Sequence, residues 1–127
     1  MNSANKTKPT LLRAPLMLMA ASLLSTSLVH AADQHSADEI AAAVSGHSYQ
    51  GSMLEPNSGF NEYYAPDGTI VGAGYEGQWT TKDGEMCFAY GEAPTCYEVS
   101  IDGPSMVLRQ GGKIKGNGML IKGKTIN

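Results

Sequence analysis

Residues 79–101 read WTTKDGEMCFAYGEAPTCYEVSI, and this stretch alone predicts two successive β-hairpins. Asp83-Gly84 lies between two runs rich in aromatic and β-branched residues. Asp-Gly is a preferred pair at the centre of a two-residue hairpin turn, because both positions tolerate a positive φ. With that turn, Lys82 faces Glu85 and Trp79 faces Phe88 on the neighbouring strand.

Cys87 and Cys96 set the register of the second hairpin. They are nine positions apart, and two cysteines in an oxidising compartment are expected to form a structural disulfide. If they lie directly opposite each other, Met86 faces Tyr97, which agrees with the register of the first hairpin. A metal site at the cysteines is disfavoured because only Glu92 adds a donor between them. One face of the sheet then forms the candidate core, with Ile101 beside Trp79, Met86, Phe88, Tyr90, Tyr97 and Val99, and the disulfide lies on the other face.

The flanking sequence repeats this pattern. Asp67-Gly68 and Asp102-Gly103 predict further turns, and all nine aromatic residues lie between Tyr49 and Tyr97, where we expect them to form the core. Glycines at 72, 74, 77, 111, 112, 116, 118 and 123 are typical of bends in a curling sheet. The predicted fold is mainly β: a small antiparallel meander that forms a curled sheet or small barrel, with one short N-terminal helix.

The helix is predicted over residues 36–44. Ser36 and Glu39 have the spacing of a capping box, and the three alanines that follow Ile40 favour helix. Gly46 suits the end of the helix. Ile40 and Val44 share one apolar side, so we expect the helix to lie on a larger element.

The first 31 residues have the organisation of a cleavable signal peptide. Lys6, Lys8 and Arg13 precede an uncharged, mostly apolar run, and Val29-His30-Ala31 offers a cleavage site. The run is shorter than the roughly 20 residues of a transmembrane helix. We therefore expect no transmembrane span, a single β-rich domain over residues 32–127, and a location in the periplasm or outside the cell.

Charge narrows the class of partner. Without the three basic residues of the leader, 6 basic and 12 acidic residues remain, a net charge of −6. Such a domain is a poor candidate for nucleic-acid binding. Lys113 and Lys115 alternate along the basic C-terminal segment, which is typical of an exposed edge strand, although attraction to acidic lipid or protein is an alternative.

Several motifs together resemble a group of small exported bacterial domains of unknown function, common in alphaproteobacteria. The matching pieces are Ser45-Gly46, Gly51, residues 63–69 (YYAPDGT), Gly77-Gln78-Trp79, Asp83-Gly84, Cys87-Phe88 and Cys96-Tyr97. The resemblance covers most of residues 32–127. It implies a small antiparallel β-domain with one disulfide, and it brings no activity, ligand or catalytic residue.

Candidate sites are few. No Ser/His/Asp set can be assembled, so we expect no catalytic residue, no enzyme activity and no cofactor. Cleavage after Ala32 would place His35 third in the mature chain, where with the free amine it can bind copper(II) or nickel(II), and His47 is a second candidate metal ligand; both are alternatives to our expectation of no metal. The disulfide-closed loop that contains Glu92 and Pro94 is the candidate interaction loop.

Three functions are compatible with these features. The first is a non-catalytic binding or interaction module that presents tyrosines to a protein or small molecule. The second is an inhibitor of an exported or host hydrolase that acts through the Glu92–Pro94 loop. The third is a carrier of a small ligand or metal, which ranks last because large aromatic side chains are expected to fill so small a barrel.

Overall fold

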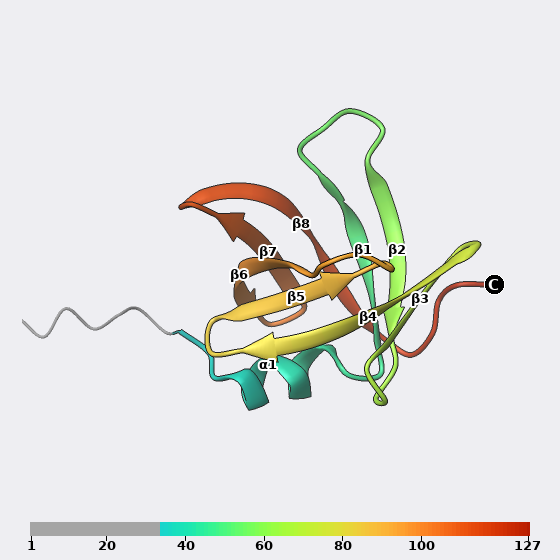
Figure 1. The fold of residues 1–127 in the computed structure, drawn as a ribbon, viewed down its shortest axis with the longest axis horizontal. Coiled ribbons are helices and arrows are strands. Elements are labelled where there is room, and N and C mark those ends of the chain that lie inside the picture. Colours follow the sequence, from blue (N-terminus) through green and yellow to red (C-terminus); the bar gives the residue numbers. More distant parts are fainter. Residues whose placement is uncertain (1–33) are drawn as a thin grey trace, which may run out of the picture.

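The computed structural model describes residues 34–127, and the predicted signal peptide, residues 1–31, lies outside the described residues. Residues 34–127 form one helix followed by eight strands (Figure 1). Their bounds are α1 (Ala37–Val44), β1 (His47–Met53), β2 (Gly59–Tyr64), β3 (Thr69–Gly72), β4 (Tyr75–Lys82), β5 (Glu85–Ala89), β6 (Thr95–Asp102), β7 (Ser105–Gln110) and β8 (Lys113–Lys122).

The eight strands form a closed antiparallel barrel with up-and-down order. Each strand pairs with its neighbours in sequence, and β8 returns to pair with β1 along its length, from His47 opposite Lys122 to Met53 opposite Gly116. The predicted mainly β fold with one short N-terminal helix is therefore confirmed. β8 pairs with β7 on one side and, from Gly116 to Lys122, with β1 on the other. Lys113 and Lys115 precede the stretch that pairs with β1, so the edge-strand interpretation of these two lysines stays a prediction.

The predicted hairpin register is confirmed. Lys82 lies opposite Glu85, Trp79 opposite Phe88, and Cys87 opposite Cys96. One turn differs from the prediction: Asp102 pairs with Ser105, so the central residues between β6 and β7 are Gly103 and Pro104 instead of Asp102-Gly103.

Up-and-down order gives the barrel two different ends. The turns β2–β3, β4–β5 and β6–β7 lie at the end covered by α1, which we call the closed end (Figure 1). The loops β1–β2, β3–β4, β5–β6 and β7–β8 surround the opposite end, which we call the open end. Helix α1 packs against β1, β4 and β5, and its side chains Ile40 and Val44 are fully buried in the core. This apolar pair closes one end of the barrel.

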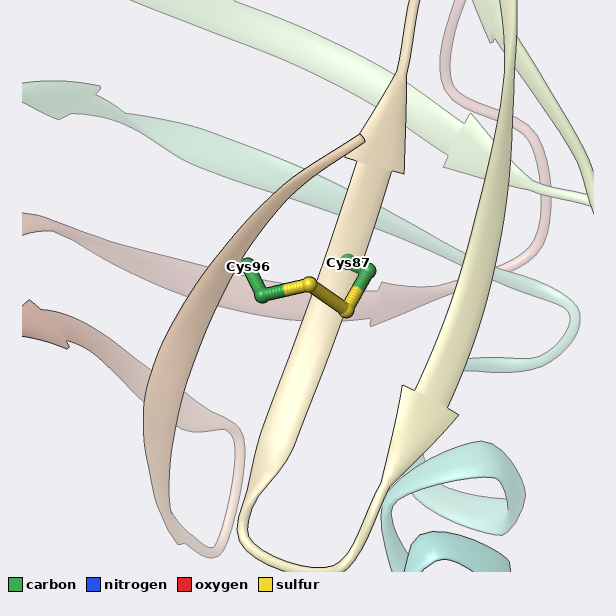
Figure 2. The surroundings of a disulfide bond; sticks show 2 residues. All are labelled: Cys87 and Cys96. Carbon is green, nitrogen blue, oxygen red and sulfur yellow. A yellow bond between two sulfur atoms is a disulfide. The ribbon is translucent and has the colours of Figure 1, made fainter. Parts of the chain in front are cut away.

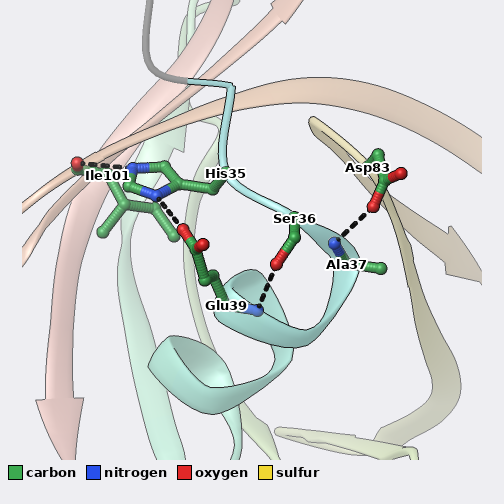
Figure 3. A network of polar contacts seen from close by, with 6 residues as sticks. All are labelled: His35, Ser36, Ala37, Glu39, Asp83 and Ile101. Carbon is green, nitrogen blue, oxygen red and sulfur yellow. Dashed lines mark hydrogen bonds and ion pairs between the residues drawn. The ribbon is translucent and has the colours of Figure 1, made fainter.

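Helix α1 is fixed at its N-terminus by its own cap and by the β4–β5 turn (Figure 3). Ser36 Oγ accepts a hydrogen bond from the Glu39 amide at 3.2 Å, and Asp83 Oδ1 accepts one from the Ala37 amide at 2.9 Å. Thr81 Oγ1 also donates to the Ala37 carbonyl at 2.8 Å. Two otherwise unpaired amides of the first turn are thus satisfied, and the helix is joined to the turn it covers.

The core fills the closed end and the middle of the barrel. The prediction is confirmed for Trp79, Met86, Phe88 and Val99, which are buried, and Tyr97 packs against them partly buried. It is wrong for Tyr90, which is 48% exposed because it follows β5 at the rim of the open end. The expectation that all nine aromatic residues form the core also fails for Tyr75, which is 41% exposed at the same end.

Candidate ligand site at the open end of the barrel

A cavity of about 560 Å³ opens between the strands at the open end. The side chains that line it come from β1, β2 and the loop between them, from β4 to β7, and from Tyr90 after β5. They are Tyr49, Met53, Ser58, Phe60, Glu62, Tyr64, Tyr75, Phe88, Tyr90, Thr95, Tyr97 and Leu108. The expectation that aromatic side chains fill the barrel therefore holds at the closed end and fails at the open end.

The walls of the cavity are mostly aromatic. Tyr49 packs on Phe60 with ring centroids 4.9 Å apart, and Phe88 packs edge-on against Tyr97 at 5.9 Å. Tyr64 lies 6.0 Å from Phe88 and continues this wall toward the closed end. Rigid rings of this kind offer a large apolar surface at little entropic cost to an apolar ligand.

Glu62 is the only carboxylate among the described residues that line the cavity. It occupies an inward position of β2 between Phe60 and Tyr64, and only 7% of its surface is exposed. Its Oε1 accepts hydrogen bonds from the hydroxyls of Tyr75 at 2.8 Å and Tyr90 at 2.6 Å. Its Oε2 accepts one from the Tyr64 hydroxyl at 3.2 Å. Three tyrosines thus converge on one buried carboxylate.

Two glycines allow Tyr75 and Tyr90 to reach Glu62. The Tyr75 ring lies against Gly72, where an added Cβ would be 2.1 Å from the ring, and the Tyr90 ring lies against Gly77, where a Cβ would be 2.7 Å from it. A side chain at either glycine would push the ring away. The two rings meet edge to face with centroids 5.9 Å apart, so each also holds the other.

The cluster keeps its hydroxyls protonated. Burial raises the pKa of Tyr64, Tyr75 and Tyr90 above the ordinary value of 10.0, and the negative charge of Glu62 raises each further. All three are therefore hydrogen-bond donors at neutral pH, with their protons directed at the carboxylate.

The predicted disulfide is present, with Cys87 and Cys96 directly opposite on β5 and β6 and their Cα atoms 4.0 Å apart (Figure 2). It closes the loop that contains Glu92 and Pro94, both of which are exposed. This loop surrounds the open end, because Tyr90 before it and Thr95 after it both line the cavity. The candidate interaction loop therefore lies at the rim of the cavity.

The two candidate metal ligands lie away from the cavity. His35 precedes α1 and contacts Glu39 Oε2 at 3.0 Å through Nδ1 and the Ile101 carbonyl at 3.2 Å through Nε2 (Figure 3). His47 begins β1, and its Nδ1 contacts the Ser45 carbonyl at 2.9 Å. Within residues 34–127, no group of three or more histidine, cysteine, aspartate or glutamate side chains is arranged to hold a metal ion.

Sequence reasoning missed Glu62 and the tyrosines around it as a site. One signal was available: Phe60, Glu62 and Tyr64 alternate with Asn61 and Tyr63, so a charged residue occupies a position that the pattern assigns to the barrel interior. A buried carboxylate at an inward position is uncommon unless it is paired, and it therefore indicates a site.

Comparison of the chain with protein-family models, curated proteins and solved structures gives no match. The resemblance to small exported alphaproteobacterial domains stays a prediction. Among the described residues, no helix has the length and apolar character needed to cross a membrane.

Proposed function

We propose that this domain is a non-catalytic binding module that holds a small, mostly apolar ligand in the open end of its barrel. The observation that carries the proposal is the contrast between a closed end sealed by α1 and an open end with an aromatic cavity around one buried carboxylate. The leader sequence and the disulfide support the further proposal that the domain acts in the periplasm or outside the cell.

The size and the lining of the cavity suit a small molecule. Ligand sites in proteins commonly have roughly 300–1,000 Å³, walls that are mainly hydrophobic or aromatic, and a few polar groups that orient the ligand. The cavity of about 560 Å³, with rings on its walls and the Glu62 cluster on one side, has each of these features. Barrels of eight strands can hold one small ligand in this way.

The inhibitor hypothesis has a narrower basis. It depends on the exposed loop with Glu92 and Pro94, which the disulfide closes. A hydrolase would have to accept this loop as a rigid insert in its active site. The same loop has a simpler use in a ligand-binding barrel, since it forms part of the rim. We therefore rank ligand binding first.

The proposal is tested with Nile red, a neutral apolar dye that fluoresces strongly in apolar surroundings. We expect one dye per domain, with NMR shift changes at the open end and none at α1. Thr95→Phe places a ring in the cavity and should abolish binding, whereas Thr80→Phe, on the exposed outer face of β4, should leave it intact. Equal binding by both variants, or shift changes centred on α1, would overturn the proposal.

A further inference from the structure

We infer that the ligand is a cation: an aromatic or apolar molecule that carries an alkylammonium group, with Glu62 as its counter-ion. The inference rests on the proposed function, because it names the chemistry of the ligand for the same cavity. It is carried by the charge of Glu62 and by the groups that surround that charge.

Glu62 is a buried acid without a basic partner. Its three hydrogen-bond partners in residues 34–127 are neutral hydroxyls, and none of the described residues that line the cavity is a lysine, arginine or histidine. Hydroxyl donors stabilise a carboxylate but leave its net negative charge in place. Buried charges in proteins are normally paired with an opposite charge or a metal, and a cationic ligand would supply the partner that the described lining does not.

By its number of acceptor positions, the carboxylate can take one more hydrogen bond. A carboxylate offers about four acceptor positions on its two oxygens. Two on Oε1 are used by Tyr75 and Tyr90, and one on Oε2 is used by Tyr64, which leaves Oε2 with an open position. An ammonium group has three N–H donors and one positive charge, so it can donate to this oxygen and also neutralise the carboxylate.

The rings at the rim favour the same class of ligand. Tyr75 and Tyr90 are both about half exposed, and both hold Glu62 through their hydroxyls. A cation that approaches the carboxylate from the cavity passes beside these two rings, whose faces attract positive charge. The aromatic wall of Phe60, Phe88 and Tyr97 then accommodates the apolar part of the molecule.

Other ligand classes fit less well. An anion would meet the charge of Glu62 with no basic side chain in the described lining to offset it. A bare metal ion would find one carboxylate and three protonated phenols, which is a poor ligand set for the common divalent ions. A neutral alcohol could donate to Oε2, but it would leave the negative charge uncompensated.

Three indoles of similar size test the charge directly: tryptamine is cationic at pH 7, tryptophol is neutral, and indole-3-propionate is anionic. We expect isothermal titration calorimetry to show tryptamine binding at least about 30-fold more tightly than tryptophol, because a buried charge pair contributes strongly to affinity. Indole-3-propionate should give no measurable binding. If the wild-type protein binds the three indoles with equal affinity, or prefers the anion, the inference is overturned without any variant.

Variants separate this inference from the proposed function. Glu62→Gln keeps the shape and one acceptor oxygen but removes the charge, so it should reduce the preference for tryptamine over tryptophol to about 3-fold or less. Glu76→Gln, on the exposed outer face of β4, is the matched control and should keep the full preference. If Nile red binds and Glu62→Gln retains the tryptamine preference, only the inference fails. If neither Nile red nor any indole binds, the proposed function fails with it.

Discussion

The two ends of this barrel are built from the same eight strands and differ in what fills them. At the closed end, Ile40 and Val44 of α1 join Met86 and Met106 in a fully buried apolar core. At the open end, the inward positions of the same strands hold half-exposed rings and a buried carboxylate around a cavity. The comparison indicates that the closed end provides stability while the open end is left free for binding.

A division between a stabilising closed end and a binding open end is physically reasonable in a small domain. A binding cavity leaves apolar surface uncovered and holds polar groups in fixed positions, and both reduce the stability of a small domain. The closed end offsets this cost with a helix that is capped by Ser36 and tied to the β4–β5 turn by Asp83. The disulfide between β5 and β6 adds a covalent restraint next to the rim loop.

Alkaline pH should cause the largest loss of unfolding free energy, because it acts on two buried tyrosine hydroxyls. One donates to a residue of the closed end and the other to a residue of the open end. Tyr49 donates to the Met106 carbonyl and Tyr64 to Glu62, and burial raises the pKa of both above the ordinary 10.0. The unfolded chain therefore loses these protons first. Stability should be intact below pH 10 and fall above it, by about 1.4 kcal/mol per pH unit for each hydroxyl that stays protonated in the folded state.

Urea unfolding followed by the fluorescence of the single tryptophan measures this effect. Tyr49→Phe and Tyr64→Phe should each reduce the loss between pH 9 and pH 12. The two reductions should be similar, because burial raises the pKa of both hydroxyls and the loss in this range is set by the ordinary pKa of tyrosine in the unfolded chain. A fall in stability that neither replacement changes would place its origin outside these two tyrosines.

Trp79→Ala should cost about 3–5 kcal/mol of unfolding free energy, as expected for a buried large aromatic side chain. The indole is 8% exposed and donates to the Ala65 carbonyl at the closed end. Phe60→Ala, which removes a partly buried ring from the open end, should cost less than half as much. Thermal or urea unfolding of both variants, followed by circular dichroism, compares the two ends. Equal costs would contradict the division between them.

Loss of the disulfide should cost about 2.5 kcal/mol in the chain-entropy model for so short a loop. Cys87→Ala with Cys96→Ala removes the bond without adding a polar group to the buried Cys87 position. We expect a lower urea midpoint, a retained β-sheet spectrum and weaker Nile red binding, because the freed loop forms part of the rim. Unchanged stability would show that the bond does not hold the open end.

Ser36→Ala should have the smallest effect, about 1 kcal/mol, through the loss of the N-cap hydrogen bond to Glu39. Because α1 closes the end opposite the cavity, Nile red affinity should be unchanged. Ser52→Ala, on an exposed position of β1, is the control and should alter neither quantity. A drop in dye affinity for Ser36→Ala would show that the two ends are coupled.

Local signals explain how much of the fold could be predicted. The register of β4, β5 and β6 followed from one Asp-Gly turn and one cysteine pair, which act between neighbouring strands. Closure of β8 onto β1 brings together residues about 70 positions apart, such as Tyr49 and Leu120, and no local pattern specifies such a pairing.

The candidate site depends on the same long-range geometry. Glu62 and Tyr90 are 28 positions apart and meet only after β2 to β5 have curled into a barrel. Composition alone assigns Tyr75 and Tyr90 to an aromatic core. They lie at the rim instead because β4 begins at Tyr75 and β5 ends just before Tyr90. The polar cluster therefore could be suspected from the inward position of Glu62, but its partners could not be named.

A crystal structure of the domain with tryptamine tests the central claim most directly. The account predicts the indole ring in the cavity at the open end, with its ammonium nitrogen about 2.7–2.9 Å from Oε2 of Glu62. Tryptamine bound elsewhere on the surface, or a cavity filled by rearranged tyrosine rings, would contradict it.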